Sequence, residues 1–168
     1  SSAASDVYKR QVCGPSADGL LIVHSLSKRS NLAGYRAAFV AGDAAVIASI
    51  LEVRKHSGLM QPAPIQAAAV AALDDDAHVA EQRGRYAARR ELARAALVDA
   101  GFALSHSEAG LYLWATRHES CWQTVDWLAS RGVLVAPGSF YGTQSDQHIR
   151  VALTASDSDF AQLGERLR

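Results

Sequence analysis

Cysteine is scarce in this chain: Cys13 and Cys121 are the only two among 168 residues, and their separation fits no metal-ligand pattern. A disulfide scaffold is therefore excluded, and we expect no metal site. A single disulfide between the two thiols is an alternative, but nothing else in the sequence indicates an oxidising compartment. We expect reduced thiols and a cytoplasmic protein.

No charge of one sign predominates, because 17 Lys and Arg balance 17 Asp and Glu. A neutral chain has no electrostatic footprint for nucleic acid or for an anionic membrane. Long apolar runs are also missing, since none approaches the roughly 18 residues that a membrane helix needs. We expect a globular protein with small-molecule partners and with neither nucleic acid nor membrane as a partner. Its length suffices for one domain plus part of another.

The chain also lacks an initiator methionine. Residues 1–11, SSAASDVYKRQ, show no apolar periodicity, and a loop containing Gly14 and Pro15 follows them. We expect residues 1–11 to be a non-native join and the native sequence to start near Val12.

Two apolar runs near the N-terminus predict strands. Residues 20–24 (LLIVH) are typical of a buried strand in a parallel sheet, and residues 36–41 (RAAFVA) predict the next strand. A turn at Asp43 follows. Its carboxylate is a suitable N-cap for a helix over residues 44–56.

Helical composition dominates the middle of the chain. Alanine, leucine, glutamate and arginine fill residues 65–100, and this composition favours helix. Three consecutive aspartates, at positions 74–76, predict a break and a second helix capped by an aspartate. The arginines beyond the break alternate with glutamates, which indicates a solvated, ion-paired face rather than a nucleic-acid patch. They are Arg83, Arg85, Arg89, Arg90 and Arg94, with Glu81 and Glu91.

After Gly101 short strands alternate with helices. We expect strands at residues 111–115, 133–136 and 147–154, and helices at residues 122–130 and 156–167. Ser156 or Asp157 is the expected N-cap of the last helix. Strands separated by helices indicate the α/β class.

Lys28 follows the first predicted strand, with Ser25 and Ser27 before it and Arg36 eight residues after it. A lysine amine at a strand end, partly removed from water, can form a Schiff base with an aldehyde. Hydroxyls and a planar guanidinium suit a phosphate group. These residues predict a pyridoxal phosphate (PLP) site, with Gly34 allowing a tight turn beside the phosphate. The alternative is an ordinary surface lysine that follows serines.

A second candidate site lies near the C-terminus. Residues 135–142 (VAPGSFYG) form a turn-rich loop, and Arg150 follows in an otherwise apolar strand. A buried arginine without a partner is very costly. Arg150 is therefore either ion-paired inside the protein or reserved for an anionic ligand.

These segments together resemble the fold-type I, class I/II PLP-dependent aminotransferases. The resemblance rests on HSLSKRSNLAGYRAAFVAGD, EAGLYLWA, GVLVAPGSFYG and the strand HIRVAL, all in the order that the family has. It implies that Lys28 holds the cofactor and that Ser25, Ser27 and Arg36 bind its phosphate.

The same resemblance implies a substrate site. Arg150 would clamp the substrate α-carboxylate, and Phe140 and Tyr112 would contact the substrate. Tyr112 and Trp114 alternate along one strand, so they share a face. Core aromatics of the smaller domain are the alternative for both.

The resemblance further implies a fold and a domain plan. The expected fold is α/β, the C-terminal part of the PLP-dependent transferase fold: residues 12–72 end the large domain and residues 73–168 form the small one. The family's N-terminal half, with its Gly-rich turn and Asp-x-x-Tyr pair, is not visible, and residues 6–8 only mimic that pair. We expect a homodimer for the full-length protein and little or no transaminase activity from this chain alone.

Within the family, the sequence is most similar to actinobacterial N-succinyldiaminopimelate aminotransferases. That implies amino transfer between N-succinyl-L,L-diaminopimelate and 2-oxoglutarate in lysine biosynthesis. One alternative is another PLP enzyme of the same fold, either a different aminotransferase or a β-lyase. A second alternative is a catalytically inert truncated domain.

A third alternative comes from a different family. Ser25 and Lys28 also spell Ser-x-x-Lys, the nucleophile motif of penicillin-binding proteins and serine β-lactamases. Those proteins also need Ser-Asp-Asn and Lys-Thr-Gly. Here residues 145–147 (SDQ) are only a partial match to the first, and the second is absent.

Overall fold

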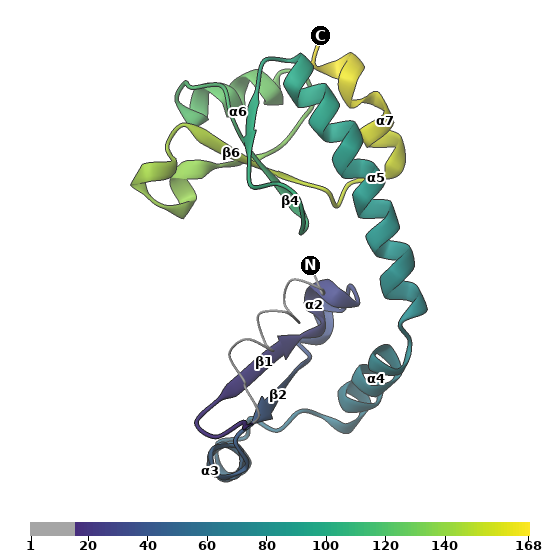
Figure 1. The fold of residues 1–168 in the computed structure, drawn as a ribbon, viewed down its shortest axis with the longest axis vertical. Helices are drawn as coiled ribbons and strands as arrows, with labels where there is room; N and C mark the ends of the chain where they lie inside the picture. The colour runs from purple at the N-terminus through teal and green to yellow at the C-terminus, as the bar shows by residue number, and fades with distance from the viewer. Residues whose placement is uncertain (1–15) are drawn as a thin grey trace. The chain divides into compact units, whose positions relative to one another are not determined.

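The structure is a computed structural model, and it describes residues 16–168. Two compact units follow one another along the chain: an N-terminal unit that ends at Glu81 and a C-terminal unit from Gln82 to Arg168 (Figure 1). The expected join at residues 1–11 lies outside the described residues, as does Cys13. The predicted domain boundary between residues 72 and 73 stays a prediction.

A two-stranded hairpin organises the N-terminal unit. Strand β1 (Leu21–Ser25) pairs antiparallel with β2 (Ala38–Gly42), and Ser25 lies opposite Ala38. Residues 26–37 close the hairpin through a short helix, α2 (Leu26–Arg29), and a 3₁₀ turn, η1 (Ala33–Tyr35). Leu26, which is 1% exposed, fixes this closure because its N–H donates to the carbonyl of Ala37 over 3.1 Å.

The two strands are confirmed, but the buried parallel setting expected for residues 20–24 is wrong. Val23 is 71% exposed, and β1 has β2 as its one partner strand among residues 16–168. A parallel pair needs a crossover that returns the chain to the starting edge. Residues 26–37 instead fold back on themselves, so the strands run in opposite directions.

Two helices complete the N-terminal unit. Helix α3 (Ala44–His56) begins as expected after Asp43, whose Oδ1 accepts from the N–H groups of Ala45 at 2.8 Å and Val46 at 3.2 Å. Helix α4 (Ala63–Asp74) carries Pro64 in its first turn, where a missing N–H is not needed. No residue of either helix is fully buried.

The expected break at the three aspartates is confirmed. Helix α5 (Ala77–Asp99) begins after it, and Oδ1 of Asp75 accepts from the N–H of Ala77 at 2.8 Å. The expected face of arginines paired with glutamates is wrong at two positions. Arg89 pairs with Asp157 and Arg90 donates to the carbonyl of Gly110, so both are half-buried attachments inside the C-terminal unit.

A four-stranded antiparallel sheet forms the C-terminal unit, in the order β3-β4-β6-β5. The strands are β3 (Ala103–Ser105), β4 (Tyr112–Thr116), β6 (His148–Ala152) and β5 (Ala136–Pro137). Strand β3 was not expected, and β5 is shorter than the predicted strand over residues 133–136. The other two strands are confirmed.

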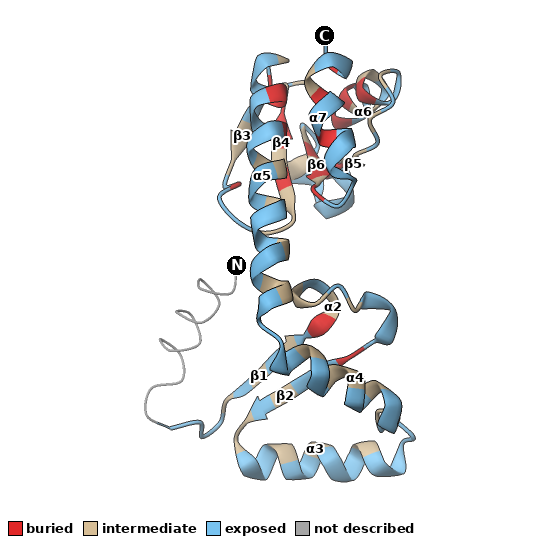
Figure 2. Cartoon of the chain, turned by 90° about the vertical axis from the view of Figure 1, so that its right-hand side faces the viewer, coloured by how far each residue is buried: buried red, intermediate tan, exposed pale blue. Residues whose placement is uncertain are grey.

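Two further helices join α5 in this unit: α6 (Cys121–Ala129) and α7 (Asp157–Arg166). Ser156 is the N-cap of α7, within a capping box closed by Asp159. Figure 2 shows most of the fully buried residues in this unit. Cys121, a free thiol, is one of them.

The alternation of side chains along β4 and β6 gives the sheet two different faces. Leu113, Ala115, Ile149 and Val151 are buried and belong to the core cluster, together with residues of α5, α6 and α7. Tyr112, Trp114, His148 and Arg150 alternate with them and are half-buried. This second face carries the charged and aromatic groups.

Candidate functional site

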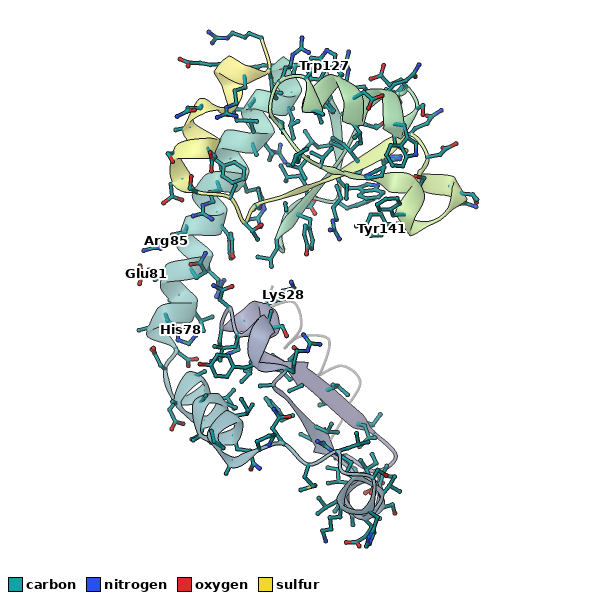
Figure 3. All side chains as sticks on the ribbon, turned by 180° about the vertical axis from the view of Figure 1, so that it is seen from behind. Lys28, His78, Glu81, Arg85, Trp127 and Tyr141 are labelled. Atoms are coloured by element: carbon teal, nitrogen blue, oxygen red, sulfur yellow. The ribbon has the colours of Figure 1, made fainter. Side chains whose placement is uncertain are left out.

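Lys28 lies in α2, at the closed end of the β1–β2 hairpin (Figure 3). Ser25 is the N-cap of α2: its Oγ accepts from the N–H of Ser27 at 3.2 Å and donates to Oγ of Ser27 at 2.9 Å. The Lys28 side chain is exposed and has neither a hydrogen bond nor an ion pair with residues 16–168. The amine therefore has no partner within residues 16–168, and the two linked hydroxyls belong to the same short segment of the chain.

Arg36 reaches the same end of the hairpin through strand pairing. It stands two residues before Ala38, which lies opposite Ser25. Its backbone is left-handed, with φ 53°, and its Nη1 donates to the carbonyl of Ala33 at 3.0 Å. The structure thus brings Ser25, Lys28 and Arg36 into one segment, residues 25–37, which we call the lysine loop.

Gly34 lies inside the 3₁₀ turn η1, but this turn does not require a glycine at that position. Gly34 has no left-handed backbone, and a Cβ at this position would meet nothing within 4 Å. The left-handed residues of the loop are Asn31, with φ 54°, and Arg36. Asparagine tolerates this region better than most residues, so it serves the turn.

Arg29, next to Lys28, is a site-supporting residue that sequence reasoning missed. Its Nη1 donates to the carbonyl of Ala72 at 2.7 Å, and its Nη2 lies 2.6 Å from Oδ1 of Asp76. The Arg29 side chain is 18% exposed. These contacts attach the lysine loop to the end of α4, and no local sequence pattern connects residues so far apart.

The second face of the C-terminal sheet holds Arg150. Its guanidinium carbon lies 4.2 Å from the ring centroid of Tyr112 and 5.0 Å from that of Tyr141. Its Nε is buried without a hydrogen-bond partner, and no carboxylate of residues 16–168 lies within ion-pair distance. Of the two options for a buried arginine, the described part of the chain lacks the internal ion pair.

Further aromatic rings lie on the same sheet face, and sequence reasoning did not assign two of them, Tyr141 and His148, to the site. Trp114 lies opposite Arg150 in the β4–β6 pair, packs edge-on against Tyr141 at 5.7 Å and stacks on His148 at 5.4 Å. Tyr141 and His148 flank predicted residues in sequence, and period-two alternation with Arg150 could have identified His148.

Phe140 lies elsewhere. Its ring is 69% exposed and packs edge-on against Trp122 of α6 at 5.9 Å, and no ring contact links it to Arg150. The structure therefore brings Tyr112 and Arg150 together and places Tyr141, rather than Phe140, beside them. A substrate contact by Phe140 stays a prediction.

Other features of the described chain lie apart from these clusters. A hollow of about 580 Å³ along α5 is lined by charged side chains such as Arg90, Glu91 and Arg94. No residue of the Lys28 or Arg150 cluster lines it. Residues 16–168 hold no group of three or more metal-ligating side chains. No helix in that range has the length and apolar character to cross a membrane.

Comparison with known proteins identifies the family. The family model described as "Aminotransferase class I and II" matches residues 3–167. This chain belongs to that family. The match replaces the penicillin-binding alternative, although Ser25 does stand at the start of a short helix as that alternative requires.

Among curated relatives, the chain is 61% identical over 156 residues to the 4-dedimethylamino-4-oxo-anhydrotetracycline transaminase OxyQ of Streptomyces rimosus. That alignment covers 93% of this chain and 44% of OxyQ. The chain is also 61% identical to the probable aminotransferase Rv1178 of Mycobacterium tuberculosis, covering 96% of the chain and 38% of the relative. It is 35% identical to the LL-diaminopimelate aminotransferase of Oleidesulfovibrio alaskensis, covering 86% and 38%.

Solved structures agree on the fold. An aminotransferase from Neisseria meningitidis superposes with a TM-score of 0.82 at 30% identity, covering 94% of this chain and 42% of that one. One from Staphylococcus aureus gives 0.78 at 26% identity, covering 90% and 41%. The fold is confirmed as a C-terminal portion of this α/β fold. The chain spans about two fifths of the length of these proteins.

The class I/II aminotransferase family and its fold depend on PLP. The residues of the lysine loop fit this cofactor on their own chemistry: Lys28 offers an unpartnered amine, and Ser25 and Ser27 offer linked hydroxyls next to it. Arg36 adds a guanidinium at the same hairpin end. An aldehyde and a phosphate group match this donor set.

Proposed function

We propose that this chain is the part of a PLP-dependent aminotransferase that carries the cofactor lysine and the receptor for the substrate carboxylate. The observation that supports it most is the lysine loop. There Lys28, whose amine has no partner within residues 16–168, follows the bonded pair Ser25 and Ser27 in sequence, and Arg36 stands two residues before the residue that pairs with Ser25.

Each residue of the loop has a distinct role in the proposal. PLP, when bound, supplies the electron sink of the reaction. Lys28 holds the cofactor and moves a proton at the substrate α-carbon. Ser25, Ser27 and Arg36 hold the phosphate, and the planar fork of Arg36 offers two parallel charge-assisted hydrogen bonds.

Arg150 binds the substrate α-carboxylate in this proposal. Its charge is covered by aromatic rings while its N–H donors remain without a protein acceptor at Nε. A bidentate contact fixes both the position and the plane of a carboxylate, which orients the rest of the substrate. Tyr112, against the same guanidinium, lines the site, and Phe140 is proposed as a more distant substrate contact.

The proposed substrates are N-succinyl-L,L-diaminopimelate and 2-oxoglutarate, in lysine biosynthesis. Similarity to LL-diaminopimelate aminotransferases supports this choice. A different amino acceptor is the second candidate, because OxyQ, whose name gives an oxo-anhydrotetracycline substrate, is more similar to the chain. A hybrid in which this chain replaces the matched part of Rv1178 distinguishes the two candidates. The hybrid is assayed with 2-oxoglutarate and with the oxo-anhydrotetracycline as amino acceptors.

The remaining parts of the proposal concern the whole protein. We propose a cytoplasmic homodimer that acts on small amino and oxo acids. The chain alone turns over substrate little or not at all in this proposal, because it spans about two fifths of its relatives.

PLP titration followed by borohydride reduction tests the proposal. We expect a new absorbance band on adding PLP, and we expect mass spectrometry to find reduced PLP on Lys28. Lys28→Ala should abolish the label. Lys55→Ala is the matched control, because Lys55 is a helix lysine paired with Glu52 at 2.6 Å. Equal labelling of both lysines, or none, would favour the inert-domain alternative.

A further inference from the structure

Arg150 has an uncommon combination of surroundings for a half-buried arginine. Two tyrosine rings lie within 5.0 Å of its guanidinium carbon, and its Nε has no acceptor. A carboxylate partner would neutralise the charge and also occupy the N–H donors. Aromatic faces attract the charge through their quadrupoles but leave the donors unused.

The two tyrosine rings are held in position in different ways. Tyr112 comes from β4, whose register with β6 is fixed by five residue pairs, so its position follows from the sheet. Tyr141 comes from the 3₁₀ turn η2 (Gly138–Tyr141), outside the sheet. Its ring packs edge-on against Trp114, which in turn stacks on His148. Tyr141 is therefore held by a chain of rings and not by backbone pairing.

Gly138 allows η2 to approach β6. A Cβ at this position would fall 1.9 Å from the carbonyl oxygen of Ser145 and 2.5 Å from that of His148. Both atoms are backbone atoms, so they cannot move aside as a flexible side chain could. The absence of a side chain at Gly138 thus decides where Tyr141 lies.

We infer that Tyr141 is a positioning residue, which holds the guanidinium of Arg150 in the orientation that receives a carboxylate. It acts through its ring face, with no hydrogen bond to Arg150, so its hydroxyl is dispensable. This inference rests on the role proposed above for Arg150. It excludes such a role for Phe140, whose ring packs on Trp122 instead.

The test uses the chain itself and 2-oxoglutarate as the carboxylate probe. The NMR signal of the Arg150 Nε–H group reports both the nearby rings and the binding of the probe. Tyr141→Leu should move this signal in the free protein and weaken 2-oxoglutarate binding about 5-fold. Tyr141→Phe should keep the signal and bind within about 2-fold of the unmodified chain, because the ring face remains.

Trp122→Leu is the matched control, since it removes a half-exposed ring of the same unit that has no contact with Arg150 and no role in the proposed site. It should change neither the signal nor the binding. Thermal unfolding of each variant checks that the sheet is intact, which we expect because Tyr141 is 47% exposed.

The outcomes separate this inference from the role of Arg150. If Arg150→Lys abolishes binding but Tyr141→Leu leaves it unchanged, Tyr141 is no positioning residue and Arg150 keeps its role. If Tyr141→Phe weakens binding as much as Tyr141→Leu, the hydroxyl matters and the ring-face inference is overturned. If no binding depends on Arg150, both are overturned, while PLP labelling of Lys28 remains an independent test of the proposed function.

Discussion

Nη2 of Arg29 lies 2.6 Å from Oδ1 of Asp76, so the residue next to Lys28 is attached to the segment between α4 and α5. The same guanidinium also donates to the carbonyl of Ala72 at 2.7 Å. The two contacts differ in environment, because the hydrogen bond to Ala72 is part-buried, whereas the Asp76 side chain is 90% exposed. Water screens the ion pair strongly, and the carbonyl contact, on the less exposed side, carries more of the stabilisation.

Arg29→Ala should therefore loosen the lysine loop. We expect the N-terminal unit to lose about 1–3 kcal/mol, because a part-buried carbonyl is left without its donor. PLP labelling of Lys28 should fall, since α2 is no longer attached to α4. Asp76→Asn is the comparison, with an expected loss within about 1 kcal/mol. Urea unfolding followed by circular dichroism measures both, and equal losses would show that the ion pair dominates.

Local chemistry made much of the N-terminal unit predictable. The N-cap at Asp43 and the helix after it were predicted with the observed bounds, because a carboxylate satisfies the free N–H groups of a first turn. The break at residues 74–76 followed from the same rule. The direction of β1 was not predictable, because an apolar run specifies a strand but not its partner.

The residues of the candidate site also fall into those that the sequence could suggest and those that it could not. Residue type and offset made Lys28 and Arg36 candidates, whereas the role of Arg150 came from the family resemblance, and all three roles stay predictions. Tyr141 could not be distinguished from Phe140, since both follow Gly138 in one short turn and only the packing of that turn separates them. Arg29 was missed because its partners lie more than 40 residues away along the chain.

The contrast between Leu26 and Val23 tests the exposed setting of β1. Leu26→Ala should cost about 2–5 kcal/mol, because Leu26 is 1% exposed and closes the lysine loop. Val23→Thr should change the free energy of unfolding by less than about 0.5 kcal/mol, because Val23 is 71% exposed. A large loss for Val23→Thr would restore the buried strand that the sequence predicted.

The effect of Leu26→Ala can be measured separately in the two units of the chain. All three tryptophans, at positions 114, 122 and 127, belong to the C-terminal unit. The unfolding curve detected by tryptophan fluorescence reports the C-terminal unit, so it should be the same for Leu26→Ala and for the unmodified chain. Hydrogen exchange at the amides of β1 and β2 reports the N-terminal unit and should be faster in Leu26→Ala.

Gly138→Ala should disturb the second sheet face. The added methyl group meets backbone oxygens of Ser145 and His148 at 1.9 and 2.5 Å, so η2 must move. We expect a loss of about 1–3 kcal/mol and a change in Trp114 fluorescence, because Tyr141 moves with η2. Gly164→Ala is the control: it lies inside α7 with open space around it, and it should gain about 0.5–1 kcal/mol. A Gly138→Ala variant as stable as the parent would contradict the close approach.

The last prediction concerns acid. The N–H of Gly19 donates to Oδ2 of Asp43 at 2.8 Å, and the N–H groups of Val46 and Ala45 donate to Oδ1. These hydrogen bonds hold the pKa of Asp43 below its usual value of 3.8, because they favour the charged form. A carboxyl whose pKa is lower in the folded state stabilises the fold at pH values above the unfolded pKa. That stabilisation is lost as the pH falls through the folded pKa.

Asp43→Asn keeps a capping side chain but cannot titrate, so it isolates this effect. At neutral pH the unmodified chain should be the more stable of the two, with the difference constant down to about pH 5. Below about pH 4 the difference should shrink, because the unmodified carboxyl takes up a proton. Thermal unfolding of both proteins from pH 7 to pH 2.5 measures it. A difference that persists unchanged to the lowest pH would mean that the amide is simply a poorer cap, and that the charge of Asp43 contributes nothing.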